Sequence, residues 1–376
     1  MKIVIDEEIP YGKLLFSLIG QVNLINSTQI SSKILRNTDI LIIRSVTQIN
    51  QKLLENNTLK FIGSVTSGTD HIDFSILKNM KIKLSIANGC NANAVAEYVF
   101  AAILYVAKIN NFFLNDKVIG IVGLGNIGSC LYHKLNTYGI ETILCDPLLE
   151  GKTNYNLVSL EKLITKSSII TLHTPLNKYG KYPTWHLINK DIIDIIPTNS
   201  IIVNTSRGSV IDNKFLLKVI NHGKLIHLIL DVWENEPNIS IQLLNKVIIG
   251  TPHIAGYTLN SKIKGIIKIF SDCINFFNLN LDNNWYKLLP SNIIRYNVNC
   301  TSLNDNILRL LINKLYNIKN DDIKLRDIVK NYGNFNLLRK HYKYRNEWST
   351  INVTSSNITI LKKLFNIGFT IKKKYN

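Results

Sequence analysis

The sequence has few cysteines, few arginines and no long uncharged apolar run, and each shortage excludes a class of protein. Five cysteines in 376 residues are scattered, odd in number and without C-x-x-C spacing, so neither a disulfide framework nor a metal site is predicted. A membrane-spanning helix needs about 18 consecutive apolar residues, and we identify no uncharged run of that length. Acidic residues break the N-terminal apolar run early, so it is not a secretory signal. These features favour a protein of the reducing cytoplasm, without a membrane segment.

Arginine contributes only 8 of the 44 basic residues, although the net charge is +18. The lysines are spread thinly among asparagine and isoleucine along the chain. A nucleic-acid-binding surface needs its positive charge gathered on one face or segment. Binding of nucleic acid is therefore a minor alternative and is not predicted.

The strand pattern indicates an α/β protein. The chain is longer than one compact core usually allows, and 46% of its residues are apolar. Short strand-like runs alternate with helix-length segments, and their apolar residues are consecutive and do not alternate with polar ones, which is typical of parallel strands buried on both faces. The runs are residues 3–5, 40–44, 61–65, 118–125, 142–146, 169–176, 200–208, 228–234 and 247–256.

A glycine-rich turn follows one of these strands. The sequence GLGNIG places Gly123, Gly125 and Gly128 in the G-x-G-x-x-G pattern, and a helical segment follows it. The first glycine permits a tight turn, the second lets a pyrophosphate approach the backbone, and the third lets the helix pack closely. Asp146 ends the next strand, about 20 residues on, where a carboxylate accepts hydrogen bonds from a ribose diol and repels a 2′-phosphate. The pattern predicts a dinucleotide site that prefers NAD.

Three polar residues follow later strands, at the sheet edge where such folds bind ligands. They are Arg207, Glu236 and His253, and together they suit the oxidation of a 2-hydroxy acid. Arg207 can bind a carboxylate through its planar fork, and His253 can accept the hydroxyl proton as hydride leaves the carbon. Glu236 can orient the imidazole and favour its protonated form. Asp231 is better placed for the nicotinamide amide than for proton transfer. Each residue alone has an ordinary structural explanation, but their grouping predicts an active site.

The motifs GLGNIG, HTPL, NTSRG, DVWENEP and TPHIAG together resemble those of the D-isomer-specific 2-hydroxyacid dehydrogenases. Further segments, at the N-terminus and over residues 333–349, are similar to members of that family that carry a third domain. The resemblance spans essentially the whole chain. It implies NAD-dependent oxidation of a phosphorylated 2-hydroxy acid, with the arginine, glutamate and histidine above as the catalytic group.

The resemblance also implies further ligand contacts and a homodimer formed through the C-terminal domain. Besides the three glycines and Asp146, the implied NAD contacts are Asn126, Ile127, Thr174, Ser206, Arg207, Asp231 and Gly256. The implied substrate contacts are Ser45, Thr66 and Tyr257. Arg44 is a candidate for the substrate phosphate, and so is Arg345 reaching in from a neighbouring subunit; the sequence does not decide between them.

The predicted fold is therefore α/β, with two Rossmann-like doubly wound parallel-sheet domains and a small α+β C-terminal dimerisation domain. Residues 1–92, completed by 256–281, form the substrate-binding domain, residues 93–255 the NAD-binding domain, and residues 282–376 the C-terminal domain. Two alternatives stay open. One is another D-2-hydroxyacid dehydrogenase, acting on phosphoglycerate or hydroxypyruvate, and the other is a non-catalytic regulator that binds NAD.

Overall fold

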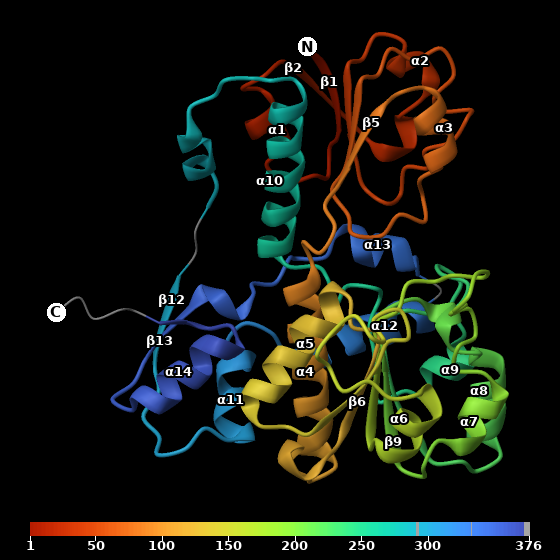
Figure 1. Cartoon of the computed structure of the whole chain (residues 1–376), viewed down its shortest axis with the longest axis vertical. Coiled ribbons are helices and arrows are strands. Elements are labelled where there is room, and N and C mark those ends of the chain that lie inside the picture. The colour runs from red at the N-terminus through yellow and green to blue at the C-terminus, as the bar shows by residue number, and fades with distance from the viewer. Residues whose placement is uncertain (291–292, 332, 372–376) are drawn as a thin grey trace. The chain divides into compact units, whose positions relative to one another are not determined.

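The computed structural model describes residues 1–290, 293–331 and 333–371 (Figure 1). By its internal contacts the chain divides into two compact units. Unit 1 is Met1–Asn91 with Thr258–Asn292, and unit 2 is Ala92–Tyr257 with Ile293–Asn376. The C-terminal segment groups with the unit that contains the glycine-rich turn, and the division into three domains stays a prediction.

Unit 1 is built on a five-stranded parallel sheet in the order β2-β1-β3-β4-β5. Its strands are β1 (Lys2–Asp6), β2 (Gln21–Ile25), β3 (Ile40–Ile43), β4 (Phe61–Ser64) and β5 (Lys83–Ile86). Its helices are α1 (Gly12–Phe16), α2 (Ser32–Leu35), α3 (Phe74–Asn79) and α10 (Leu259–Phe276), with short 3-10 turns η1 (Ser27–Gln29) and η4 (Asn283–Leu288).

Successive residues of the central strands of unit 1 enter two separate cores. Ile40 and Ile42 of β3 pack in one core with residues of α1 and α10, whereas Leu41 and Ile43 pack in the other with residues of α2 and α3. Strand side chains alternate between the two faces of a sheet. A strand covered on both faces therefore needs an unbroken apolar run, which is what the sequence has here.

Unit 2 contains a six-stranded parallel sheet in the order β11-β10-β9-β8-β6-β7. Its strands are β6 (Ile119–Val122), β7 (Thr142–Cys145), β8 (Ile169–Leu172), β9 (Ser200–Asn204), β10 (Ile226–Leu230) and β11 (Ile249–Gly250). Around it are α4 (Ala92–Ile109), α5 (Asn126–Tyr138), α6 (Leu160–Lys166), α7 (Lys190–Ile195), α8 (Asn213–Asn221) and α9 (Ile241–Leu244), with η2 (Leu114–Asp116) and η3 (Gly208–Val210). The predicted class, with two parallel sheets, is confirmed.

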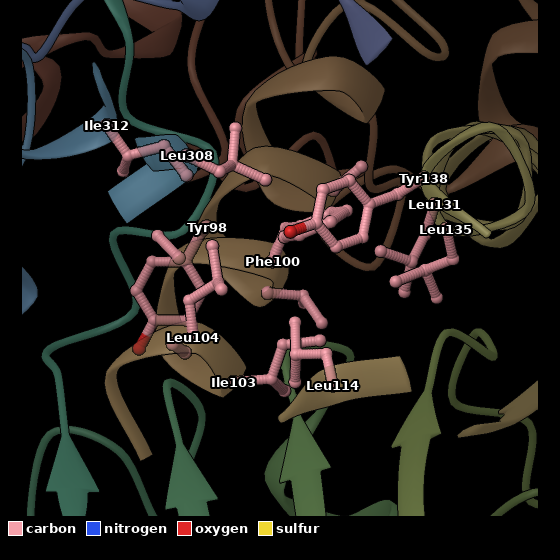
Figure 2. Close-up of a cluster of buried hydrophobic side chains, with 14 of the residues drawn as sticks. Tyr98, Phe100, Ile103, Leu104, Leu114, Leu131, Leu135, Tyr138, Leu308 and Ile312 are labelled. Atoms are coloured by element: carbon pink, nitrogen blue, oxygen red, sulfur yellow. The ribbon is translucent and has the colours of Figure 1, made fainter. Parts of the chain in front are cut away.

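Helix α4 is the central core helix of unit 2. Figure 2 shows its side chains in one buried cluster with those of η2, α5 and α11 (Asp305–Asn313): Tyr98, Phe100, Ile103, Leu104, Leu114, Leu131, Leu135, Tyr138, Leu308 and Ile312. By length and composition alone α4 is able to cross a membrane, although Glu97 and Lys108 interrupt its apolar sequence. Most of the helix is buried inside the protein, as the core helix of a folded domain is.

The C-terminal segment forms a second, smaller sheet in unit 2, with three parallel strands in the order β12-β13-β14. Its remaining elements are β12 (Ile294–Asn297), α12 (Ile318–Lys330), α13 (Phe335–Lys340), η5 (Trp348–Thr350), β13 (Ile351–Thr354), α14 (Ile358–Ile367) and β14 (Thr370–Ile371). Asp322 of α12 accepts a hydrogen bond from the amide of Gly250 at 2.9 Å. Helix α12 thus covers the β11 edge of the six-stranded sheet, which removes an exposed strand edge.

A buried polar cluster joins this segment to α4 and α5. Glu97 accepts hydrogen bonds from Asn93 at 2.8 Å and from the amide of Trp348 at 2.9 Å, and it lies 3.6 Å from Lys134. Asn93 also donates to Glu347 at 2.7 Å, so one side-chain amide bonds to both carboxylates. Burial, reinforced by the charge of Glu347, raises the pKa of Glu97 to about 7, although Lys134 opposes the shift.

This cluster gives unfolding a defined pH dependence. The pKa of Glu97 is higher in the folded state than its usual 4.5, so the folded protein holds an extra proton between these values. The resulting stabilisation is complete below the unfolded pKa and is lost as the pH rises through about 7. Between pH 5 and 8 we expect the free energy of unfolding to fall by about 3 kcal/mol from this group. Urea unfolding should show that fall in the wild type and in the exposed control Glu150→Gln, but not in Glu97→Gln. Equal slopes in all three would contradict the assignment.

Candidate active site

The glycine-rich turn has the conformation that its sequence requires. Gly123 follows β6 directly and has a φ of +89°, which side-chain-bearing residues rarely adopt. At Gly128 an added Cβ would lie 1.9 Å from the carbonyl oxygen of Gly123, so α5 packs against the turn without room for a side chain. At Gly125 an added Cβ would meet nothing within 4 Å. The backbone is open at the one glycine where the pyrophosphate is predicted to approach.

The turn leads directly into a helix N-terminus. Asn126, Ile127 and Gly128 begin α5, a helix of 13 residues, and no side chain caps it at Gly125. The amides of a first helical turn lack acceptors within the helix, and the helix dipole favours negative charge there. This end of α5 therefore suits a phosphate group.

Asp146 and Thr174 border the same turn. The Asp146 carboxylate accepts hydrogen bonds from the amides of Leu124 at 2.8 Å and Leu148 at 3.1 Å, which places it at the glycine-rich turn. An added Cβ at Gly123 would lie 3.1 Å from Cγ2 of Thr174. The Thr174 hydroxyl oxygen is buried and has no hydrogen-bond partner in the described part of the chain. These residues fit NAD, while the contact of each with the cofactor stays a prediction.

Asn204 shapes the loop that carries Ser206 and Arg207. Its side-chain oxygen accepts hydrogen bonds from the amide of Ser206 at 3.0 Å and from the hydroxyl at 2.8 Å, and its nitrogen donates to the carbonyl of Arg207 at 2.9 Å. The Arg207 guanidinium donates to the carbonyl of Ser206 at 2.8 Å. An added Cβ at Gly208 would lie 1.9 Å from the carbonyl carbon of Trp233. The loop after β9 thus packs directly on the loop after β10.

Asp231 organises the loop after β11. It is buried, and its carboxylate accepts hydrogen bonds from the Thr251 hydroxyl at 2.6 Å and from the amides of Ile254 at 2.8 Å and Ala255 at 2.9 Å. Its own carbonyl accepts a bond from the amide of His253 at 2.7 Å. Asp231 therefore fixes the backbone on both sides of His253. The predicted contact with the nicotinamide amide stays a prediction.

Glu236 and His253 are in direct contact, as the proposed chemistry needs. Nδ1 of His253 lies 2.8 Å from Oε2 of Glu236, and the other carboxylate oxygen accepts a bond from the amide of Trp233 at 2.9 Å. Burial would raise the pKa of Glu236, but the charge and hydrogen bond of His253, the Trp233 amide and the charge of Arg339 together lower it. Glu236 is thus held ionised at neutral pH, oriented to support a cation on the imidazole.

The C-terminal segment contributes a buried arginine to this loop. Arg345 donates to the carbonyls of Ile254 and Ala255, and to that of Ala94 on α4 at 3.3 Å. Its bond to Ile254 measures 2.8 Å, and the side chain is only 8% exposed. The suggestion that Arg345 reaches into a neighbouring subunit's site is therefore wrong for this structure: it holds the catalytic loop of its own chain. The same loop continues into Gly256 and Tyr257.

The remaining predicted substrate residues belong to unit 1. Ser45 and Thr66 follow β3 and β4, which are neighbours, so they lie at the carboxyl edge of the five-stranded sheet. Arg44 forms ion pairs with Asp6 at 2.8 Å and with Glu8 at 2.7 Å. These two carboxylates already neutralise the positive charge of Arg44 that would attract a phosphate. The substrate roles of these residues stay predictions.

Sequence reasoning missed several residues that support the site. Asn204 and Trp233 lie inside the motifs that drew attention to the site, but nothing in their spacing showed which backbone groups they bind. The indole nitrogen of Trp233 donates to the carbonyl of Thr251 at 2.9 Å. Arg339 was not identified, and Arg345 was a candidate only for the substrate phosphate, because both lie far along the chain and no local pattern connects them to the loop at His253.

Comparisons with known proteins agree with this geometry. A family model described as the NAD-binding domain of D-isomer specific 2-hydroxyacid dehydrogenases matches residues 103–255. A second model, described as a domain of unknown function, matches residues 288–368. Two relatives named erythronate-4-phosphate dehydrogenase come from Wigglesworthia glossinidia brevipalpis and Baumannia cicadellinicola. They are 49% and 46% identical to this chain, over 99% and 98% of it and 99% of each relative.

Solved structures support the fold. The NAD⁺-bound 3-phosphoglycerate dehydrogenase of Entamoeba histolytica has a TM-score of 0.64, covering 74% of this chain and 96% of that one at 24% identity. The D-lactate dehydrogenase of Aquifex aeolicus, complexed with NAD and lactic acid, has a TM-score of 0.61 with the same coverage and identity.

The fold and the site thus define an NAD-binding D-isomer specific 2-hydroxyacid dehydrogenase. Within that class, identity over nearly the whole length shows that the chain belongs to the erythronate-4-phosphate dehydrogenase family.

The glycine-rich turn yields a matched pair of variants. Gly125→Ala adds a methyl group to open space, so we expect normal thermal stability but at least tenfold weaker NAD binding, because the methyl obstructs the pyrophosphate. Gly128→Ala forces α5 off the turn, so we expect both stability and NAD binding to fall. Calorimetric melting measures the stability of both variants. Titration with NAD, followed by the quenching of the protein's tryptophan fluorescence, measures their affinity for NAD. Unchanged NAD affinity in Gly125→Ala would exclude this turn as the pyrophosphate site.

The Arg345 contacts predict an effect on turnover. Arg345→Lys keeps the charge but loses the planar guanidinium that donates to several backbone carbonyls at once. The loop that carries His253 is then no longer held in position. We expect kcat to fall at least tenfold while NAD affinity changes less than about threefold, since small misplacements of a catalytic group are costly. Steady-state kinetics test this, with the exposed Lys343→Met as control. A loss of activity no greater than the loss of folded protein would contradict a positioning role.

Proposed function

We propose that this protein catalyses the NAD-dependent oxidation of 4-phospho-D-erythronate to 3-hydroxy-2-oxo-4-phosphooxybutanoate, a step of pyridoxal 5′-phosphate synthesis. The observation that carries it is the contact of His253 with Glu236 in a dinucleotide fold, since the loop after β10, which holds Glu236, packs directly on the loop of Arg207. The names of the relatives support the choice of substrate.

The residues divide the work of oxidising a secondary alcohol. Bound NAD supplies a nicotinamide ring that accepts the hydride from C2 of the substrate. Arg207 binds the carboxylate next to C2 and so fixes which hydrogen faces the ring. His253 takes the hydroxyl proton through Nε2, because its Nδ1 is bonded to Glu236. The C2–H and O–H bonds break, a carbonyl forms, and the imidazolium is stabilised by the ionised Glu236.

The proposal extends to assembly and location. We propose a homodimer formed through the C-terminal segment and a cytoplasmic enzyme, as in the sequence-based prediction. The free state of all five cysteines agrees with a reducing compartment. Sedimentation of the purified full-length protein over a range of concentrations tests the dimer.

Removing the imidazole tests the reaction. His253→Ala should bind NAD with unchanged affinity and lose turnover of 4-phospho-D-erythronate by about 10² to 10⁴-fold, the usual contribution of a general base. The exposed His222→Ala serves as the control. The wild type should be assayed in parallel with 3-phosphoglycerate and D-lactate. Better turnover of 3-phosphoglycerate would identify a different dehydrogenase, and tight NAD binding without any turnover would identify a regulator.

A further inference from the structure

An arginine of the C-terminal segment lies beside the catalytic loop. Arg339, on α13, donates from Nη2 to the Tyr257 hydroxyl at 3.1 Å. Its guanidinium carbon lies 5.7 Å from the centre of the Tyr257 ring. The Tyr257 amide in turn bonds to the carbonyl of Ile254 at 2.8 Å, inside the loop of His253. All of these residues belong to unit 2, so the arginine and the proton-transfer pair are parts of one compact body.

The charge of Arg339 is poorly compensated. In the described part of the chain its recorded contacts are the hydroxyl and ring of Tyr257, and its Nε is buried with no hydrogen-bond partner. A buried guanidinium donor left unpaired costs free energy. It also exerts a field on its neighbours, and that field contributes to the lowered pKa of Glu236. These features are expected of a group that receives an anion from outside the protein.

The other inward-facing arginines are already engaged. Arg44 is paired with two carboxylates, Asp6 and Glu8. Arg345 is held by backbone carbonyls, and Arg326 by Asp322 and two further carbonyls. Arg207 is the predicted partner of the substrate carboxylate. The remaining arginines are exposed or bonded to a surface side chain: Arg36, Arg295 and Arg309.

We propose that Arg339, together with the Tyr257 hydroxyl, binds the phosphate end of the substrate, an inference that rests on the proposed function. A phosphate monoester dianion prefers the guanidinium fork. The Tyr257 hydroxyl accepts a bond from Arg339, so its own proton is directed elsewhere and can be donated to a phosphate oxygen. The substrate is then held at both ends, by Arg207 at the carboxylate and by Arg339 at the phosphate. Arg339 thereby determines the preference for phosphorylated 2-hydroxy acids.

The test compares two substrates that differ only in the phosphate. Arg339→Met should lower kcat/KM for 4-phospho-D-erythronate by about 10- to 100-fold, the range for a lost charged hydrogen bond. For D-erythronate the change should stay within about threefold, because no phosphate contact is lost. Arg339→Lys keeps the charge without the fork and should give an intermediate loss. The exposed Arg295→Met, in the same C-terminal segment, should behave as the wild type.

Equal losses on both substrates would mean that Arg339 acts only by positioning Tyr257 and Glu236, and would overturn the proposal. Unchanged kinetics in Arg339→Met would overturn it as well. If Arg339→Met does not fold, Arg339→Lys replaces it in the test. The proposal then requires that kcat/KM of Arg339→Lys fall for 4-phospho-D-erythronate but not for D-erythronate.

A second measurement separates this proposal from the proposed function. Calorimetric titration of the NAD-loaded protein with inorganic phosphate should show at least tenfold weaker binding in Arg339→Met than in the wild type and Arg295→Met. If the wild type fails to oxidise 4-phospho-D-erythronate but this difference appears, the proposed function fails and the anion site stands. Equal phosphate affinity in all three proteins overturns the assignment of Arg339, whatever the substrate.

Discussion

The active site depends on the buried carboxylate of Asp231. His253 has a φ of +58°, a backbone conformation that L-residues seldom adopt, so its loop needs bonds from outside to persist. The Asp231 carboxylate accepts such bonds from the Thr251 hydroxyl and from the amides of Ile254 and Ala255. A buried carboxylate without such donors would be destabilising. The Asp231 carboxylate and the strained loop therefore stabilise each other. As a result the His253 imidazole is held pointing toward Glu236.

The features that the sequence predicted are those set by a few neighbouring residues. Gly123, Gly125 and Gly128 each do in the structure what their spacing requires, because a positive φ, an open backbone and a close helix contact all depend on the absence of a Cβ. Asp146 lies at the turn because it directly follows β7, the strand next to β6. Strands buried on both faces, such as β3 and β9, were found from their unbroken apolar runs.

The features that were missed depend on residues far apart in the chain. β2 is mostly exposed and β5 only partly buried, so neither has a strong apolar run. The apolar stretch over residues 306–318 is divided between two helices, since α11 ends at Asn313 and α12 begins at Ile318. The buried contact of Glu97 with Lys134 joins two helices and the C-terminal segment, and no sequence spacing encodes it. The sequence-based hypothesis assigned Arg345 to a substrate phosphate, but in the structure it donates hydrogen bonds to backbone carbonyls of its own chain.

The bond between Arg345 and the loop at Tyr257 spans 88 residues of chain. A ribosome emits a chain from its N-terminus, and the earlier parts fold first. The strands of both large parallel sheets, β1–β5 and β6–β11, are therefore synthesised before Arg345, which holds the catalytic loop. The catalytic loop of the nascent protein is therefore fully held only after Arg345 has been synthesised. A fragment that ends just before Arg345 contains both Glu236 and His253 but lacks the arginine that holds the loop of His253 in place.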